Sequence, residues 1–413
     1  MPRFGRAFQP DARARRTGSF PDRDLISPDL PLPACARAAR SWAMTDSRQT
    51  PLAQSLPASV PFVGPETHER QRGAPFVARL GANENLFGVS PKAIAAMQAS
   101  AAEIWKYGDA ESYELRAALS ALHGIAPEHI MVGEGIDGLL GNLVRLYVGA
   151  GDAVVTSLGA YPTFNYHVAG FGGDLHTVPY KDDHEDIKAL MAKAHEVGAK
   201  LVYLANPDNP MGSWHRGADI VAALDDLPEG SLLVLDEAYV ECAPKGTAAP
   251  VDVTDPRVIR MRTLSKAYGM AGARVGYAMG AVEVISAFHK VRNHFGMNRC
   301  AQIGATEAIK DQAWLAHVQA EIATAREEIS RIARENGLTP LPSATNFVAI
   351  DCGRDGAFAK AVLEALVARD IFVRMPFAAP QNRCIRVSCG PERERRAFAE
   401  ALPLALKDAQ NGA

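Results

Sequence analysis

Short runs of apolar residues recur along the chain from about residue 81, and most are followed by a turn and a stretch with helical spacing. Such runs predict buried strands, here at residues 129–133, 153–158, 200–205, 231–235 and 258–263. Strands that alternate with helices form a parallel sheet covered by those helices. We therefore expect an α/β fold with a mostly parallel sheet.

The pattern changes after about residue 299. A charged amphipathic helix is expected at 312–336, and a second helix at 356–369 lies among strands expected at 346–351, 371–374 and 384–388, before a closing helix. This order predicts a smaller α+β domain at 299–413, after a large domain at 93–298. Residues 44–92 are expected to form an arm that contributes to the small domain.

The composition argues against several classes of protein. The chain has 44 Lys and Arg against 47 Asp and Glu, a net charge of −3, which favours neither nucleic acid nor an anionic membrane surface. No run approaches the roughly 18 apolar residues of a membrane-spanning helix. Six cysteines lie far apart without a C-x-x-C pair, so we expect free thiols in a reducing cytoplasm and no metal site.

Residues 1–43 differ from the rest of the chain, with eight arginines, six prolines and neither lysine nor glutamate. They lack the apolar stretch of a secretory signal and contain too many prolines for a transit-peptide helix, so we expect disorder. A nucleic-acid-binding arm is the alternative. Ordinary composition resumes at Met44, which suggests that translation begins there, and the intact mass of the native protein would test this.

Polar residues follow several of the predicted strands, at the edge of the sheet where α/β proteins bind ligands. A glycine-bearing turn at 133–138 opens a helix and offers backbone N–H groups to a phosphate. Asp236 ends an apolar strand, where a carboxylate is costly unless a cation meets it. The stretch 262–276 adds two hydroxyls, a lysine and an arginine, which suit a phosphate beside an amine nucleophile.

Together these residues resemble the pyridoxal-phosphate (PLP) enzymes of the aspartate aminotransferase fold, and most closely their histidinol-phosphate aminotransferase branch. The resemblance covers residues 78–405 and rests on motifs in the family's order: Asn83-Glu84-Asn85, Tyr107-Gly108-Asp109, Asn209, Asp236 to Tyr239, Ser265-Lys266 and Arg274. The intervals of 27, 30 and 8 residues between the last four motifs also match. The resemblance implies the PLP-dependent transferase fold of type I, with PLP as cofactor.

The resemblance also implies roles for the catalytic residues. Lys266 would bind the cofactor covalently and then move the proton of the substrate's Cα. Asp236 would pair with the pyridine nitrogen. Asn209 and Tyr239 would hydrogen-bond the phenolic oxygen, and Phe164 would stack on the ring.

The remaining matches concern phosphate and substrate. The groups implied for the cofactor phosphate are Gly135, Ile136, Asp137, Thr263, Ser265, Arg274 and Tyr107, the last from a neighbouring subunit, which implies a homodimer. The residues implied for the substrate are Asn85, Asn346, Arg374 and Arg386. The expected reaction is a ping-pong transamination from histidinol phosphate, or from an aromatic or other amino acid, to a 2-oxo acid, with 2-oxoglutarate as the expected acceptor.

Some positions depart from the family's usual pattern. The turn at 133–138 lacks a hydroxyl and an acid, Phe87 stands where many relatives have tyrosine, and Met211 replaces the usual threonine. Phe87 cannot offer a hydroxyl to a substrate phosphate. Two rival functions stay open: a decarboxylase of amino-acid phosphates on the same fold, and a PLP-sensing transcriptional regulator, although residues 1–75 show no helix-turn-helix periodicity.

Overall fold

The computed structural model describes residues 48–58, 63–250 and 252–411. The expected disorder of residues 1–43 and the suggested start at Met44 lie outside these residues. One compact unit spans residues 51–413. The division of that unit at residues 92 and 298 stays a prediction.

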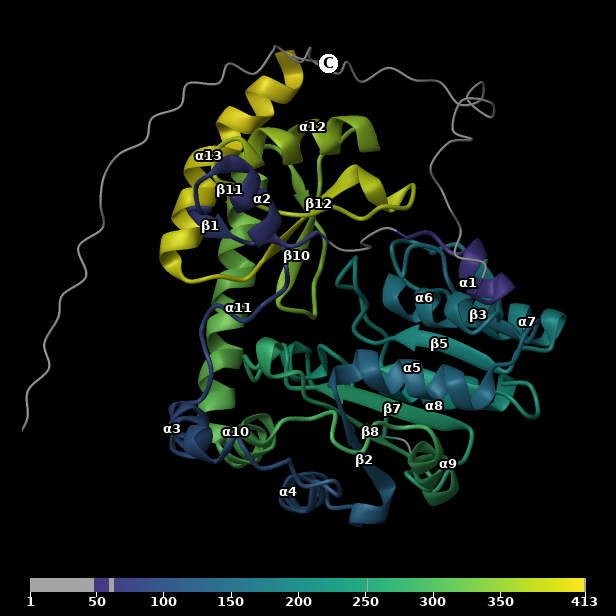
Figure 1. Cartoon of the computed structure of the whole chain (residues 1–413). Coiled ribbons are helices and arrows are strands. Elements are labelled where there is room, and N and C mark those ends of the chain that lie inside the picture. Colours follow the sequence, from purple (N-terminus) through teal and green to yellow (C-terminus); the bar gives the residue numbers. More distant parts are fainter. Residues whose placement is uncertain (1–47, 59–62, 251, 412–413) are drawn as a thin grey trace, which may run out of the picture. The chain divides into compact units, whose positions relative to one another are not determined.

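A seven-stranded sheet with the order β2-β8-β7-β6-β5-β3-β4 lies at the centre of the large α/β part (Figure 1). Only β8 runs antiparallel to its neighbours, which are β2 and β7. The strands are β2 (Ile130–Gly133), β3 (Ala153–Ser157), β4 (Asp174–Val178), β5 (Leu201–Ala205), β6 (Leu232–Asp236), β7 (Val258–Thr263) and β8 (Gly276–Met279).

The five predicted strands are confirmed, and β4 and β8 are additional. The sequence pattern did not indicate β4 because it is a partly exposed edge strand with the polar sequence DLHTV. The β8 strand has only four residues and begins with glycine, which gives it little β signal.

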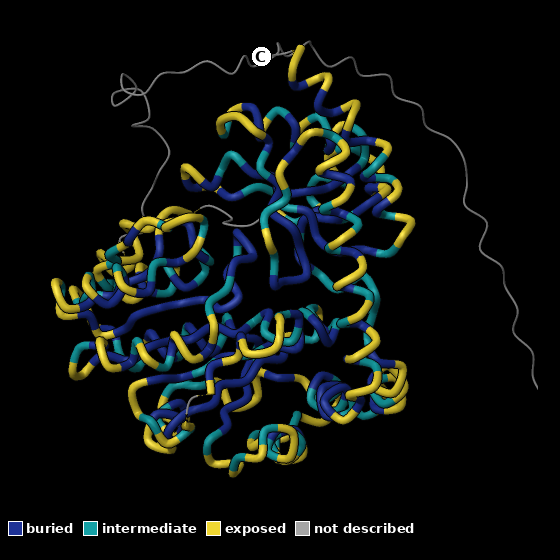
Figure 2. The backbone as a smooth tube through the Cα atoms, turned by 180° about the vertical axis from the view of Figure 1, so that it is seen from behind, coloured by how far each residue is buried: buried dark blue, intermediate teal, exposed yellow. Residues whose placement is uncertain are grey.

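Helices cover both faces of the central sheet: α5 (Gly135–Tyr147), α6 (Pro162–Gly170), α7 (Ile187–Val197), α8 (Gly217–Ala223) and α9 (Val282–Ala287). Alternate residues of β5 face opposite sides, as a strand requires. Leu201 and Tyr203 join an apolar cluster with α5 and α6, whereas Val202 and Leu204 join another with α7 and α8. Figure 2 shows the strands as buried and most exposed backbone on helices and loops.

The α+β part contains a second sheet, with the antiparallel order β12-β10-β9. The N-terminal strand β1 pairs in parallel with β11 beside it. The elements are β1 (Ala78–Arg79), β9 (Thr339–Pro340), β10 (Phe347–Asp351), β11 (Ile371–Phe372), β12 (Cys384–Ser388), α11 (Gln312–Glu335), α12 (Gly356–Val367) and α13 (Glu392–Asn411). The expected helices and strands of this region are thus confirmed, with ends that differ by up to two residues.

The remaining helices precede the central sheet or connect it to α11. They are α1 (Pro51–Ser55), α2 (Pro65–Arg72), α3 (Pro91–Ser100), α4 (Tyr113–His123) and α10 (Arg299–Lys310). Helix α10 packs against α3 and α4. The contact with α3 is close because Gly304 has no side chain: a Cβ there would lie 2.5 Å from Met97 Cγ.

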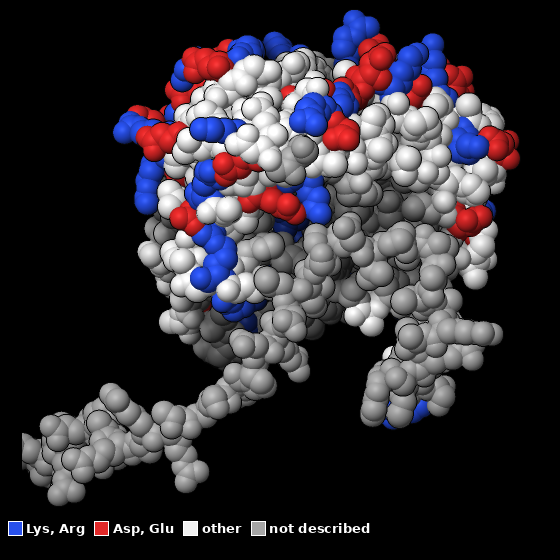
Figure 3. Space-filling view, turned by 90° about the horizontal axis from the view of Figure 1, so that it is seen from above, with Lys and Arg blue, Asp and Glu red and all other residues white. Residues whose placement is uncertain are grey.

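Surface charges of both signs are mixed. Ion pairs on α12 and α13, such as Lys360–Glu364 and Arg396–Glu392, contribute to this mixture. Figure 3 shows a face on which basic and acidic side chains lie interspersed. Among the described residues, no helix is both long and apolar enough to cross a membrane. The described cysteines are free, and Cys384 and Cys389 are buried in the core, as expected.

Candidate active site

Asp236 is a buried carboxylate at the carboxyl end of β6. It accepts hydrogen bonds from Tyr203 Oη (2.6 Å) and from the backbone N–H of Ala238 (2.9 Å). Within the described residues no cation forms an ion pair with it. Burial raises the pKa of Asp236 to about 6, although these two donors and the charge of Lys266 oppose that rise. A cationic group at this position would therefore be strongly favoured.

Lys266 lies in the loop after β7. Its Nζ donates to the carbonyl oxygen of Asn83 (3.3 Å) and lies 5.3 Å from the centre of the Tyr239 ring. Burial lowers the pKa of Lys266 to about 8, helped by the positive charges of Arg386 and Arg274. An amine with this pKa is partly unprotonated near neutral pH and can act as a nucleophile.

Arg274 and Ser265 meet the N-terminus of α5. Arg274 Nη1 lies 3.4 Å from Ser265 Oγ, and the guanidinium packs on Gly135, where a Cβ would lie 2.5 Å from Nη2. Gly135 has φ +76°, which also favours glycine. The first turn of α5 contains Ile136 and Asp137. A guanidinium, a hydroxyl and a helix N-terminus together suit a phosphate.

Thr263 forms hydrogen bonds within the loop that carries Ser265. Its Oγ1 lies 2.9 Å from Ser265 Oγ and 3.1 Å from the carbonyl oxygen of Val275, and it accepts from the backbone N–H of Ser265. The hydroxyl of Thr263 is therefore engaged within the loop, where it orients Ser265. A direct bond from Thr263 to a phosphate stays a prediction.

Arg386 on β12 is one of the two arginines predicted to bind substrate. Its Nη1 donates to Asn209 Oδ1, and its Nη2 lies 3.5 Å from the carbonyl oxygen of Gly81. Its Nε is buried without a hydrogen-bond partner among the described residues. Burial lowers the pKa of Arg386 to about 10, and the neighbouring charge of Arg374 contributes. An anionic ligand would relieve both effects.

Arg374 lies directly opposite Arg386 in an isolated antiparallel bridge. The backbone N–H of Arg386 donates to the carbonyl oxygen of Arg374 (2.6 Å), and the return bond is 3.3 Å long. Residues paired in this way point to the same side of a sheet. Arg374 Nη2 also donates to the carbonyl oxygen of Val63 (2.6 Å). The structure thus brings the two predicted substrate arginines together.

Asn83 connects these groups, although the sequence analysis assigned it no role. Its Nδ2 donates to Tyr239 Oη (3.0 Å), and its carbonyl oxygen accepts from Lys266 and from Asn346 Nδ2 (3.0 Å). It adopts φ +55°, a conformation that asparagine tolerates better than most residues. Its place in the Asn83-Glu84-Asn85 motif was the signal that could have identified it. Asn85 Nδ2 donates to the carbonyl oxygen of Ala267 (2.9 Å), next to the lysine.

The two aromatic residues predicted to contact the cofactor, Phe164 and Tyr107, differ in burial. Phe164 is fully buried, and its ring stacks on Tyr203 with centroids 4.6 Å apart, so its stacking on a cofactor stays a prediction. Tyr161, which immediately precedes α6, is half-buried, and its pKa is raised by burial and by the nearby charges of Asp137 and Asp236. Tyr107 is 78% exposed and packs on Phe295, so most of its side chain is available to a second molecule.

These groups fit PLP by their chemistry. Asp236 lacks a cationic partner within the described residues, and a protonated ring nitrogen would supply one. Lys266 offers an amine to a carbonyl, and Arg274, Ser265 and the start of α5 offer a place for a phosphate. The three groups come from neighbouring strands, because β7 lies between β6 and β8 in the sheet.

Comparisons with known proteins agree with this chemistry. The family described as "Aminotransferase class I and II" matches residues 77–402. A histidinol-phosphate aminotransferase of Anaeromyxobacter sp. (strain Fw109-5) is 36% identical over 359 residues, which cover 85% of this chain and 97% of the relative.

Solved structures give the same result. The crystal structure of histidinol-phosphate aminotransferase from Sinorhizobium meliloti, in complex with pyridoxal-5'-phosphate, is 53% identical and superposes with a TM-score of 0.85, covering 87% of this chain and 98% of that one. An aspartate aminotransferase of Thermus thermophilus with maleate shares the fold at 22% identity, with a TM-score of 0.71 and coverage of 82% and 94%. The chain therefore belongs to the class I and II aminotransferases, and it is a PLP-dependent enzyme of the histidinol-phosphate aminotransferase-like branch.

Proposed function

We propose that this enzyme transfers the amino group of histidinol phosphate to a 2-oxo acid, with 2-oxoglutarate as the acceptor. The observation that carries this proposal is the bridge between Arg374 and Arg386, which sets two guanidinium-bearing residues on one side of the small sheet. Such a pair suits anionic substrates: histidinol phosphate carries a phosphate, and 2-oxoglutarate carries two carboxylates. The names of the two similar proteins reported above support the same donor.

The residues that would hold PLP follow from the site. Arg274, Ser265 and the backbone N–H groups of Ile136 and Asp137 would bind its phosphate. Asp236 would keep the ring nitrogen protonated, with Tyr203 Oη orienting the carboxylate. When bound, PLP supplies an electrophilic carbonyl and a ring that accepts electrons.

Lys266 would have two roles, as the residue that holds the cofactor and as the base. Its Nζ would hold the cofactor covalently and, once freed by the substrate amine, would take up the proton from the substrate's Cα. The carbonyl oxygen of Asn83 and the face of the Tyr239 ring hold the amine in place. Tyr239 Oη, which accepts from Asn83, and Asn209, which accepts from Arg386, would contact the phenolic oxygen.

Arg386 would bind a carboxylate of the 2-oxo acid, and Arg374 the phosphate of histidinol phosphate. Asn346 and Asn85 would act through the backbone, since Asn346 binds the carbonyl oxygen of Asn83 and Asn85 that of Ala267. Phe87 packs against the core and carries no hydroxyl. Because Phe87 cannot donate a hydrogen bond to the substrate phosphate, the binding of histidinol phosphate would depend more strongly on Arg374.

The donor can be tested with the purified holoenzyme. Formation of glutamate from 2-oxoglutarate would be measured with histidinol phosphate, histidinol and phenylalanine as donors. We expect kcat/KM for histidinol phosphate to exceed that for histidinol by about 10- to 150-fold, the range of hydrogen bonds to a charged group. Equal values for the two donors would refute the phosphate assignment.

A matched pair of variants distinguishes phosphate binding by Arg374 from the general effect of removing a positive charge. Arg374→Gln should reduce kcat/KM for histidinol phosphate while leaving that for histidinol nearly unchanged. Arg331→Gln removes an exposed arginine paired with Glu335 on α11 and should change neither. A loss of both activities in Arg374→Gln would show a structural role instead.

We also propose that the enzyme is a homodimer with active sites shared between subunits. Large apolar or aromatic side chains of one region are more than half exposed, which is unusual for a monomer: Ile104, Trp105, Tyr107, Tyr113 and Phe295. In such a dimer the partner subunit's Tyr107 would reach the cofactor phosphate. Sedimentation analysis should give a dimer, and Trp105→Glu should dissociate it, whereas Leu404→Glu on α13 should not.

We place the enzyme in the cytoplasm. The cysteines of the described residues are free thiols, which fits a reducing compartment. Fractionation of the source cells, followed by immunodetection, would test this, and enrichment in a secreted or membrane fraction would contradict it.

A further inference from the structure

The loop between α3 and α4 carries Tyr107, and a glutamine holds its backbone. Gln302 on α10 accepts the backbone N–H of Asp109 through Oε1 (3.0 Å) and donates to the carbonyl oxygen of Asp109 through Nε2 (3.0 Å). The same Nε2 lies 3.3 Å from the carbonyl oxygen of Met297. One side chain therefore ties the loop to the segment that precedes α10.

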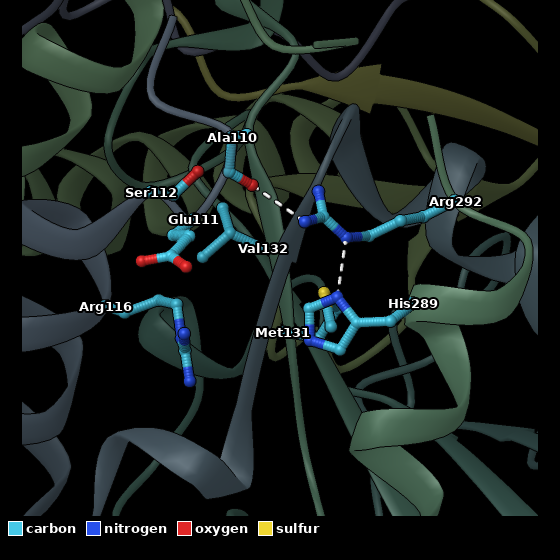
Figure 4. A pocket seen from close by; sticks show the side chains of 8 residues that line it. All are labelled: Ala110, Glu111, Ser112, Arg116, Met131, Val132, His289 and Arg292. Atoms are coloured by element: carbon cyan, nitrogen blue, oxygen red, sulfur yellow. Dashed lines mark hydrogen bonds between the residues drawn. The ribbon is translucent and has the colours of Figure 1, made fainter. Parts of the chain in front are cut away.

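An arginine forms a second tie, three residues before the start of α4. Arg292 Nη2 donates to the carbonyl oxygen of Ala110 (2.7 Å), and its Nε donates to His289 Nδ1 (3.1 Å). Figure 4 shows the guanidinium of Arg292 between these two acceptors, at the edge of a small pocket that Glu111 and Arg116 also line. The imidazole of His289 thus fixes the direction in which Arg292 points.

The loop also packs closely against the same segment. A Cβ on Gly108 would lie 2.7 Å from Gln302 Nε2 and 2.7 Å from the carbonyl oxygen of Met297, so only glycine fits without displacement. Asp109 Oδ2 accepts the backbone N–H of Tyr113 (2.7 Å), which fixes the loop to the first turn of α4. The ring of Tyr107 rests on Phe295, with centroids 4.8 Å apart.

We propose that Gln302 and Arg292 are positioning residues for the active site of the partner subunit, because they set the position of Tyr107. This inference rests on the proposed homodimer with shared sites. Tyr107 is mostly exposed, so contacts of its own side chain in one chain do little to fix its hydroxyl. A hydrogen bond from a phenol to a phosphate is short and depends strongly on position. The hydrogen bonds to Asp109 and Ala110 hold the backbone next to Tyr107 and so restrict the position of its ring.

The experiment measures the affinity of the dimer for PLP by titration of apoenzyme. Gln302→Ala should weaken PLP binding about tenfold, roughly the loss of one hydrogen bond to a charged group. Gln319→Ala is the matched control, since Gln319 likewise donates to a backbone carbonyl, that of Glu241 (2.7 Å), in another loop. It should leave the affinity unchanged. Both variants should sediment as dimers.

A double-mutant cycle distinguishes positioning from a general structural effect. Tyr107→Phe should itself weaken PLP binding, and in that background Gln302→Ala or Arg292→Gln should add little further loss. An equal loss with and without the Tyr107 hydroxyl would overturn the inference, as would an unchanged affinity of Gln302→Ala. If Tyr107→Phe has no effect, the shared site is refuted and this inference falls with it. Turnover of histidinol phosphate by the unaltered enzyme is measured separately and tests only the substrate.

Discussion

Replacing Asp236 by asparagine should stabilise the apoenzyme and impair the holoenzyme. Asp236 is buried without a cationic partner among the described residues, and burial raises its pKa from 3.8 to about 6. The folded apoenzyme therefore binds a proton more tightly than the unfolded chain, and stability is lost as the pH rises from about 4 to 6. With 1.36 kcal/mol per pKa unit, the carboxylate costs roughly 3 kcal/mol at pH 8.

Urea unfolding of the apoenzyme measures this cost. The Asp236→Asn apoenzyme should exceed the parent in free energy of unfolding by up to about 3 kcal/mol at pH 8, and by about half of that at pH 5. In the holoenzyme the carboxylate is needed, so kcat should fall by about 100-fold, the loss expected for a charge that stabilises the transition state. PLP binding should also weaken.

Glu237, the next residue in the chain, provides a control for which the expected change in the free energy of unfolding has the opposite sign. Glu237 is equally buried but pairs with Arg260 (2.9 Å) and Arg262 (2.8 Å). Glu237→Gln should therefore destabilise the apoenzyme by about 3–5 kcal/mol, because it removes the buried carboxylate that pairs with two largely buried arginines. An Asp236→Asn apoenzyme that is less stable than the parent at pH 8, or fully active with PLP, would refute the reasoning.

Three further predictions concern the cations and the glycine of the site. The rate of PLP uptake by apoenzyme, followed by absorbance in stopped flow, should rise about tenfold per pH unit below pH 8 and level off above it, since only neutral Lys266 reacts and its pKa is about 8; a pH-independent rate contradicts this. Arg386→Lys should raise KM for 2-oxoglutarate by about tenfold or more while the apoenzyme remains folded, because lysine cannot form the bidentate contact; an unchanged KM would exclude Arg386 from the carboxylate site. Gly135→Ala should weaken PLP binding, because its Cβ would displace Arg274, whereas Gly151→Ala, with a similar φ but open surroundings, should not.

The candidate catalytic residues could be singled out from sequence because each lies next to a strand in a short, ordered motif, and the family resemblance suggested their roles. Lys266, Asp236 and Arg274 were recognised because their residue types and intervals match those of the family, and the structure brings the three toward one edge of the sheet. Asn83 was missed because its importance lies in a positive φ and in carbonyl contacts, neither of which a residue type reveals. The half-buried state of Tyr161, against full burial of Phe164, also depends on packing that spacing does not encode.

The antiparallel strand β8 has a consequence for how the enzyme matures. Gly276 pairs with Gly133, so the start of α5 and Arg274 meet only when segments about 140 residues apart in the chain have joined. A nascent chain that has left the ribosome only as far as β7 contains Lys266's strand and Asp236 but no complete phosphate cradle. The groups that suit a phosphate therefore come together only in chains in which β8 has joined the central sheet.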